Sequence, residues 1–304
     1  MRTPGKVAVF VNPASGRGEG RALHASFRRL IDTDEFFKGR DVSLQWTQKK
    51  GGEAEVEKAM GDAETVLICG GDGTIHQMAN IIKKSGCDKA ISVIPIGTGN
   101  DFSRNFTNRA KEPTEHLKNI IADPKVVPLD VFSINRRAYF SNYAGIGLDA
   151  AILSTHQRML SNLSAFSKIP FFNTLLYVPA GVWTIATFVG SVAGADGLQY
   201  KNIIVGNLRT FAGGGLFCAD SSPGDGVAEV VKIRRNFELF KFGLSRFFPS
   251  LTFKNEALAR PAGVKIASSP GDAPVELDGE DYCKFFEGTR DFHLFHEGTL
   301  RVCV

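Results

Sequence analysis

The stretch from Thr65 to Lys84 constrains the fold most, because a strand, a turn and a helix can be assigned within it. The apolar run Val66–Cys69 predicts a buried strand, Gly70–Thr74 (GGDGT) predicts a tight turn, and Ile75–Lys84 predicts a helix. Glycines let a backbone approach a ligand closely, and the first N–H groups of a helix attract anions. The stretch therefore predicts a phosphate-binding site.

Asp72 lies inside this turn, where phosphate groups would gather. A carboxylate beside phosphates is unfavourable unless a cation or a hydroxyl proton lies between them, which favours metal-assisted phosphate chemistry. The alternative is an ordinary strand-to-helix turn, because similar glycine turns occur in many loops. The motif by itself does not decide between the two interpretations.

Further strand and helix patterns repeat through residues 1–128. Strands are predicted at Lys6–Val11, Val42–Thr47 and Ala90–Ile94, and helices at Gly20–Leu30 and Glu53–Met60. This alternation predicts an α/β domain with a doubly wound parallel sheet. Ligands of such sheets bind at the carboxyl ends of the strands. Glycine-bearing loops leave strand ends at residues 12–18, 70–74 and 97–101, and these loops could converge on one site.

After about Pro128 the pattern changes to short strands with turn signals, which is typical of an antiparallel domain. We assign this second domain to residues 129–295 and expect residues 296–304 to form a last strand that could return to the first domain. The dipeptide Asp278-Gly279 is a hairpin signal. The strands predicted here are Leu129–Ile134, Ala138–Tyr143, Ile203–Asn207, Gly226–Ile233, Val264–Ala267, Val275–Leu277 and Lys284–Phe286.

Composition bounds the function more loosely. A net charge of +4 is too weak to indicate nucleic-acid binding, but it is compatible with an anionic ligand or an anionic lipid surface. The 5 cysteines lack paired spacing, which fits reduced thiols in a cytosolic protein better than a disulfide framework or a zinc site. The N-terminus leads directly into a strand pattern, so we expect no signal peptide.

Two apolar stretches each have two interpretations. Phe171–Ala195 carries no charged residue and is long enough to span a bilayer, but Asn173 and Pro179 favour a buried or interfacial helix. Arg234–Lys254 interleaves phenylalanines with arginines and lysines. That pattern suits a bilayer surface, and its alternative is a core helix with a solvated basic face.

Four motifs together resemble the diacylglycerol kinase catalytic family, which includes soluble bacterial lipid kinases and the sphingosine kinases. They are Asn12-Pro13 with Ser15-Gly16, GGDGT at 70–74, PIGTGNDF at 95–102, and Asp278-Gly279-Glu280. The resemblance covers essentially the whole chain. GGDGT alone is shared with NAD kinases and is related to the phosphofructokinase turn, whereas the combination of motifs is far more specific.

The resemblance implies a Rossmann-like nucleotide domain, of the NAD kinase and phosphofructokinase type, followed by an antiparallel β-sandwich-like domain. It implies ATP-dependent, magnesium-assisted phosphorylation of a lipid hydroxyl in a cleft between the domains. The lipid would be diacylglycerol-like or sphingoid. The enzyme would be cytoplasmic and peripheral at the inner membrane surface, without a nucleic-acid partner, and relatives are often homodimers.

The resemblance also assigns roles to individual residues. Asp278 would be the general base, and Asp72 would act in catalysis and bind magnesium. Asp225 would be a ligand of a structural magnesium ion. Residues implied to bind nucleotide are Asn12, Ser15, Gly16, Thr47, Gly71, Gly73, Thr74, Thr98, Asn100, Asp101 and Glu280.

The sequence departs from the family pattern at two positions. Gln77 stands where many relatives have a glutamate after the glycine turn, and Gly224 stands where relatives have an acidic residue beside Asp225. Two other functions stay open. One is a kinase of a soluble substrate, such as NAD kinase, and the other is a non-catalytic lipid- or nucleotide-binding relative. The 95–101 motif and the phenylalanine-rich second half favour a lipid substrate, and intact Asp72 and Asp278 favour catalysis.

Overall fold

The computed structural model describes residues 6–48, 51–97, 99–106, 112–163, 172–211, 213–239 and 254–304. The chain divides into two compact units. Unit 1 comprises residues 1–131 with 298–304, and unit 2 comprises residues 132–297. Each unit is described by itself.

Unit 1 is built on a parallel sheet whose strand order is β2-β1-β3-β4-β18. Strands β1 and β3 are buried along their whole length, as their unbroken apolar sequences require when both faces of a sheet are covered. Residues 298–304 of β18 contribute the last strand, in which Arg301 pairs with Ala90. The strands are β1 (Val7–Val11), β2 (Val42–Trp46), β3 (Thr65–Gly70), β4 (Ala90–Pro95) and β18 (Asp291–Cys303).

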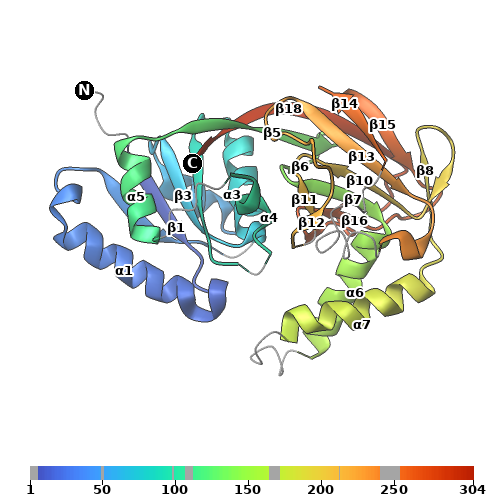
Figure 1. Ribbon diagram of the computed structural model, residues 1–304, viewed down its shortest axis with the longest axis horizontal. Helices are drawn as coiled ribbons and strands as arrows, with labels where there is room; N and C mark the ends of the chain where they lie inside the picture. Colours follow the sequence, from blue (N-terminus) through green and yellow to red (C-terminus); the bar gives the residue numbers. More distant parts are fainter. Residues whose placement is uncertain are drawn as a thin grey trace. The chain divides into compact units, whose positions relative to one another are not determined.

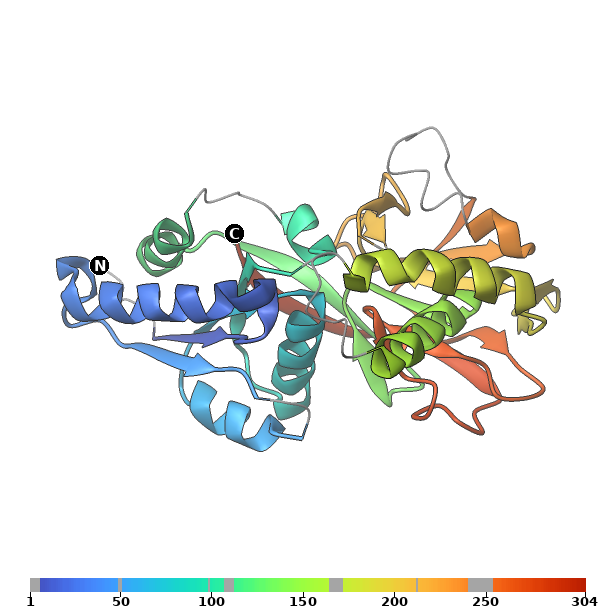
Figure 2. The ribbon, with the colours of Figure 1, turned by 90° about the horizontal axis from the view of Figure 1, so that it is seen from below.

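Helices cover both faces of this sheet, so the predicted doubly wound fold is confirmed (Figure 2). Phe27 and Leu117, on α1 and α5, pack against alternate residues of β1 and β3 on one face. Helices α2 and α3 lie on the other face. The helical elements are η1 (Ser15–Gly18), α1 (Glu19–Thr33), η2 (Glu35–Phe37), α2 (Glu53–Met60), α3 (Asp72–Ser85), α4 (Asp101–Phe106) and α5 (Pro113–Ala122).

Unit 2 is a sandwich of two antiparallel layers (Figure 1). One layer has the order β14-β13-β10-β7-β16-β17, and the other contains β5, β6, β15, β8, β9 and the first part of β18. Phe132 and Phe292 from one layer share a buried core with Ile146 and Val205 from the other. The strands are β5 (Val126–Ile134), β6 (Ala138–Phe140), β7 (Tyr143–Gly147), β8 (Val192–Gly194), β9 (Gln199–Tyr200), β10 (Asn202–Gly206), β11 (Thr210–Phe211), β12 (Gly215–Leu216), β13 (Val227–Ile233), β14 (Asn255–Ala259), β15 (Ala262–Ser268), β16 (Val275–Leu277) and β17 (Glu280–Asp281).

Two helices of unit 2 follow one another in the chain, α6 (Leu148–Asn162) and α7 (Phe172–Thr187). Figure 1 shows α6 between α7 and the strands β7 and β16. Most of the apolar stretch 171–195 thus becomes a helix that contains Pro179, followed by strand β8. Within the described part of the chain, none of the helices combines the length and apolar character needed to span a bilayer.

The basic and aromatic stretch 234–254 lies largely outside the described residues. Its first part forms the short helix η4 (Asn236–Leu239), which packs on α7. Residues 240–253, where most of the predicted surface-binding pattern falls, are among those not described.

One strand prediction is wrong. Residues 284–286 form consecutive turns, in which the Phe286 N–H donates to the Tyr282 carbonyl at 3.1 Å. Phe286 is buried against Phe292, and the guanidinium of Arg137 lies over its ring. Burial of a large aromatic side chain explains the apolar pattern here without a strand.

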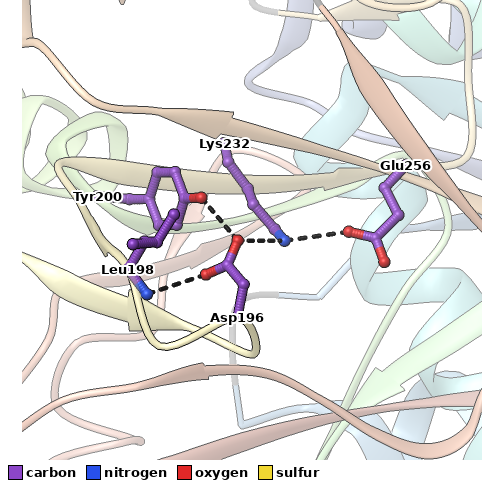
Figure 3. Close-up of polar contacts among 5 residues, drawn as sticks. All are labelled: Asp196, Leu198, Tyr200, Lys232 and Glu256. Carbon is purple, nitrogen blue, oxygen red and sulfur yellow. Dashed lines mark hydrogen bonds and ion pairs between the residues drawn. The ribbon is translucent and has the colours of Figure 1, made fainter.

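The hairpin between β8 and β9 is held by a polar network (Figure 3). Asp196 accepts hydrogen bonds from the Tyr200 hydroxyl at 2.7 Å and from the Leu198 N–H at 3.1 Å. Lys232 on β13 bridges Asp196 and Glu256 at 3.2 and 3.0 Å. The Tyr200 bond, together with Lys232, lowers the pKa of Asp196. The positive charge of Lys232 is therefore neutralised by two carboxylates.

Candidate active site

The GGDGT motif of unit 1 links a strand to a helix, as predicted, but the helix begins three residues before the expected Ile75. Strand β3 ends at Gly70, and α3 begins at Asp72 with Gly71 as its N-cap. Because the N-cap residue is a glycine, it has no side chain that could cap this helix start. The positive end of the helix dipole is therefore available for an anion, in the way that many phosphate sites use it.

The loops after β3 and β4 touch backbone to backbone. A Cβ atom on Gly97 would lie 2.4 Å from the Gly71 Cα, and a Cβ on Gly99 would lie 2.9 Å from the Asp72 Oδ2. The Ile96 N–H donates to the Gly70 carbonyl at 3.1 Å. These glycines are needed because any side chain would separate the two loops.

Asn100 closes the loop after β4. Its Oδ1 accepts from the Gly97 N–H at 3.1 Å, and its Nδ2 donates to the Gly97 carbonyl at 2.7 Å. Asn100 has φ +55°, a left-handed conformation that asparagine tolerates better than most residues. Thr98, predicted to bind nucleotide, lies outside the described residues.

Asp72 joins the two loops through its carboxylate. Its Oδ2 accepts from the Asp101 N–H at 3.2 Å, and its Oδ1 accepts from the Phe102 N–H at 3.1 Å, at the start of α4. Asp101 itself is buried. Both oxygens of the Asp72 carboxylate therefore help to fix the start of α4.

The donor set at Asp72 and Asp101 fits magnesium that is bound together with phosphates. Oxygen ligands from one or two carboxylates, completed by substrate phosphates and water, are typical of nucleotide-bound Mg²⁺. Among the described residues, the structure forms no cluster of three or more histidine, cysteine or acidic side chains.

The first loop of unit 1 joins this group through Asn12. Its Nδ2 donates to the Thr74 Oγ1 at 2.8 Å, and its Oδ1 accepts from the Ala14 N–H at 2.9 Å. The structure thus brings together, by direct contacts, five of the residues predicted to bind nucleotide: Asn12, Gly71, Thr74, Asn100 and Asp101. Three more lie at neighbouring strand ends of unit 1: Ser15 and Gly16 form the start of η1 after β1, and Thr47 follows β2 and donates its N–H to the Val11 carbonyl at 3.0 Å.

In unit 2, Asp278 and Gly279 form a two-residue hairpin between β16 and β17, in which Leu277 pairs with Glu280. Their φ angles are +53° and +81°. Two consecutive positive values are the signature of the type I′ turn that the Asp-Gly pair favours. The hairpin interpretation of Asp278 is therefore correct, and it is compatible with a chemical role for the side chain.

The Asp278 carboxylate points into the backbone that leads into β7. Oδ1 accepts from the N–H groups of Asn142 at 2.8 Å, Tyr143 at 3.0 Å and Ser141 at 3.3 Å. Oδ2 accepts from Ser141 at 3.2 Å. Three backbone donors fix the orientation of this buried carboxylate. Glu280, predicted to bind nucleotide, is half-buried on β17.

A buried acid pair beside Asp278 was not predicted. Asp149, in the first turn of α6, is a hydrogen-bonding neighbour of Glu276 on β16. A Cβ atom on Gly145 would lie 2.1 Å from the Asp149 Oδ2, so this carboxylate occupies the space that Gly145 leaves open. The spacing Gly145-x-Gly147-x-Asp149, followed by a second acid two residues before Asp278, was the available signal in the sequence.

Burial governs the ionisation of this pair. It raises the pKa of Asp149 to about 6. The pKa of Glu276 is raised well above its usual value, first by burial and then by the negative charge of Asp149. Two carboxylates that share a buried site cannot both ionise easily, so Glu276 favours its protonated form.

Asp225, the predicted ligand of a structural magnesium ion, lies in the turn before β13. Its Oδ1 accepts from the Val227 N–H at 2.8 Å. This bond organises the turn. Its role as a metal ligand stays a prediction.

Comparison with known proteins agrees with the motif-based resemblance, which is thereby confirmed. The diacylglycerol kinase catalytic domain family matches residues 6–134. A diacylglycerol kinase of Mycobacterium tuberculosis strain H37Rv is 26% identical over 271 residues, covering 81% of this chain and 78% of that protein. A Yersinia pestis protein named "Probable lipid kinase YegS-like" is 26% identical over 259 residues, covering 83% and 82%.

Solved structures agree on the fold. The crystal structure of a diacylglycerol kinase from Bacillus anthracis superimposes with a TM-score of 0.64 at 19% identity, covering 100% of this chain and 98% of that one. The combination of a Rossmann-like unit and a β-sandwich, predicted from the sequence, is confirmed by this likeness.

Proposed function

We propose that this chain, whose residues 6–134 match the diacylglycerol kinase catalytic domain family, transfers the γ-phosphate of ATP to a hydroxyl group of a membrane lipid. The lipid is diacylglycerol-like or sphingoid, and the reaction takes place at the cytoplasmic surface of the membrane. The main support for the proposal is the family match at residues 6–134. These residues include the two glycine loops, after β3 and β4, that contact each other.

Unit 1 supplies the nucleotide-binding part of the proposed reaction. The uncapped start of α3 and the glycine backbones at 71 and 97 would bind the phosphates of ATP. Asp72 and Asp101 would hold magnesium, which neutralises phosphate charge when it is bound. Phosphoryl transfer depends on positioning and charge neutralisation, and these residues are suited to both.

Unit 2 supplies the proposed base, Asp278. A lipid hydroxyl must lose its proton as it attacks the phosphorus, and a positioned carboxylate can accept that proton. Oδ1 accepts three backbone N–H bonds and Oδ2 accepts one, from Ser141, and we assign proton acceptance to Oδ2. The hairpin turn and the backbone N–H donors hold the Asp278 carboxylate in a fixed orientation, as a catalytic base requires.

A panel of phosphate acceptors tests the proposal. Purified protein, radiolabelled ATP and Mg²⁺ are mixed with diacylglycerol or sphingosine in detergent micelles, or with NAD. We expect label in the organic extract of a lipid sample, loss of labelling when EDTA removes the magnesium, and recovery when Mg²⁺ is added back. Label found in NAD alone would show that the protein acts on a soluble substrate and would overturn the proposal.

A further inference from the structure

The outward face of α7 in unit 2 is apolar. Leu175, Val178, Val182 and Trp183 are exposed by 69%, 65%, 53% and 61%. At 100° per residue these positions fall on one side of the helix, and the helix carries no charged residue. The opposite side, with Ala180 and Thr184, is buried. A surface helix normally turns polar residues outward, as α1 of unit 1 does, so this helix is built to be covered on both sides.

Side chains donate to one carbonyl in the last turn of α7 and to three carbonyls just after the helix. Asn236 Nδ2 donates to the carbonyls of Ile185 at 2.7 Å and Phe188 at 3.1 Å. Lys201 Nζ donates to the carbonyls of Val189 at 3.1 Å and Gly190 at 3.0 Å. Terminal carbonyls without partners would oppose transfer of the helix end from water to an apolar medium. These side-chain donors lower the cost of placing this segment in such a medium.

Positive charge lies at the same end of α7. Arg234 and Arg235 precede Asn236 and are exposed, and neither guanidinium forms an ion pair with another described residue. The Arg234 guanidinium lies 5.6 Å from the centre of the Tyr200 ring. Lys232 differs, because Asp196 and Glu256 neutralise it (Figure 3). The two arginines therefore present net positive charge beside the apolar face.

We propose that this face of α7 docks on an anionic lipid bilayer, with its apolar side chains in the outer acyl region and Arg234 and Arg235 among the headgroup phosphates. An apolar face, a tryptophan and adjacent cationic side chains are the features of helices that lie in the membrane interface. The inference rests on the proposed function, because a kinase that acts on a bilayer-resident lipid must reach the bilayer surface.

Fluorescence of Trp183 tests the docking directly. The chain has 2 tryptophans, so a Trp46→Phe protein reports on Trp183 alone. We mix it, without nucleotide, with vesicles of phosphatidylglycerol and phosphatidylcholine. We expect a shift of the emission to shorter wavelength and quenching by brominated acyl chains.

Charge and polarity variants locate the contact. In the same background, Val178→Glu with Val182→Glu should weaken vesicle binding at least tenfold. Val126→Glu, at an exposed position of unit 1, should change it less than twofold. Arg234→Gln with Arg235→Gln should weaken binding to anionic vesicles, but not to pure phosphatidylcholine. Thermal unfolding should be unchanged in the α7 variant, because both side chains are exposed.

The outcomes separate docking from catalysis. If Val178→Glu with Val182→Glu binds anionic vesicles as tightly as its parent, the inference is wrong. It is also wrong if these substitutions dissociate a dimer and leave vesicle binding unchanged, since a second copy would then cover α7. Vesicle binding through α7 without phosphorylation of any lipid would support the docking and overturn the proposed function. Phosphorylation of a short-chain diacylglycerol in solution should survive the α7 substitutions.

Discussion

Gly97 determines how closely the two phosphate-site loops of unit 1 can approach. Its Cβ, if present, would lie 2.4 Å from a backbone atom of Gly71, so neither side of the contact could yield by rotating a side chain. The glycines in this motif were predicted to admit a ligand. The structure adds a second reason for them, namely contact between the loops themselves.

Gly97→Ala should therefore weaken both the fold and nucleotide binding. We expect the free energy of unfolding to fall by about 1–3 kcal/mol, as for other overpacked sites, and ATP affinity to fall at least tenfold. Gly271→Ala is the matched control, because a Cβ there would meet nothing within 4 Å. Denaturant unfolding and ATP titration measure the two effects. Equal ATP affinity in Gly97→Ala and the wild type would contradict this view of the loops.

The Asp149–Glu276 pair makes the stability of the protein depend on pH. The pKa values of both acids are higher in the folded state than in the unfolded chain, mainly because of burial. The folded state therefore binds more protons, and this contribution to stability is complete below about pH 4. It is lost as pH rises toward the pKa of about 6 for Asp149, and further as Glu276 ionises.

Glu276→Gln should remove part of this dependence. Glutamine keeps a hydrogen-bond donor for Asp149 and cannot acquire a charge. We expect the variant to gain stability relative to the wild type as pH rises from 4 to 8, by on the order of 1–3 kcal/mol. Urea unfolding at several pH values measures the difference. The exposed substitution Glu256→Gln should stay within about 0.5 kcal/mol at every pH, and a difference for Glu276→Gln that does not vary with pH would refute the assignment.

Among the structural elements, α4 depends on a residue from outside itself. The Asp72 carboxylate at the start of α3 accepts the N–H groups of Asp101 and Phe102, so one side chain ties the two helix starts together. A negative charge at a helix N-terminus is stabilising by about 0.3–1 kcal/mol. In the proposed reaction the same carboxylate holds magnesium. A substitution that removes its negative charge but keeps an oxygen acceptor can therefore separate its structural role from its chemical role.

Asp72→Asn tests that separation. Asparagine keeps one oxygen for the backbone N–H groups and loses the charge. We expect the free energy of unfolding to fall by about 1 kcal/mol and phosphoryl transfer to fall at least a hundredfold. The matched control is Asp88→Asn, at an exposed site paired with Arg301, which should keep activity within twofold. Loss of activity rescued by stabilising conditions would show a purely structural role.

Local sequence predicted the elements that carry their own signals. The run Val66–Cys69 with GGDGT correctly predicted a strand followed by a helix, because hydrophobicity and glycine chemistry act within a few residues. The helix start was predicted three residues too late, since α3 begins at Asp72. The hairpin predicted from Asp278-Gly279 was confirmed for the same reason. The strand predicted at residues 284–286 was wrong, because an apolar pattern cannot distinguish a strand from a turn that places Phe286 in a core.

The acid pair could not be predicted by the same route. Asp149 and Glu276 are far apart in the sequence, and their interaction depends on α6 packing against β16. The exposed face of α7 was also ambiguous, since an uncharged apolar run predicts burial without saying what buries it. Tertiary packing determines both features.

At the scale of the whole molecule, each unit contributes different chemistry to the proposed reaction. Unit 1 carries the glycine loops, Asp72 and Asp101, and unit 2 carries Asp278 in its hairpin. The family match covers residues 6–134, whereas Asp278 lies outside that range. The proposed role of Asp278 as general base therefore requires a test of its own.

Single-turnover transfer of labelled phosphate by Asp278→Asn, with enzyme in excess over ATP and lipid acceptor saturating, is that test. We expect the rate of transfer to fall about 10²–10⁴-fold, the contribution typical of a positioned general base, while ATP affinity stays within twofold. Asp272→Asn is the control, since this exposed carboxylate of unit 2 also accepts a backbone N–H bond, from Gly288 at 2.7 Å, and it should react like the wild type. Transfer by Asp278→Asn at the wild-type rate would contradict the account.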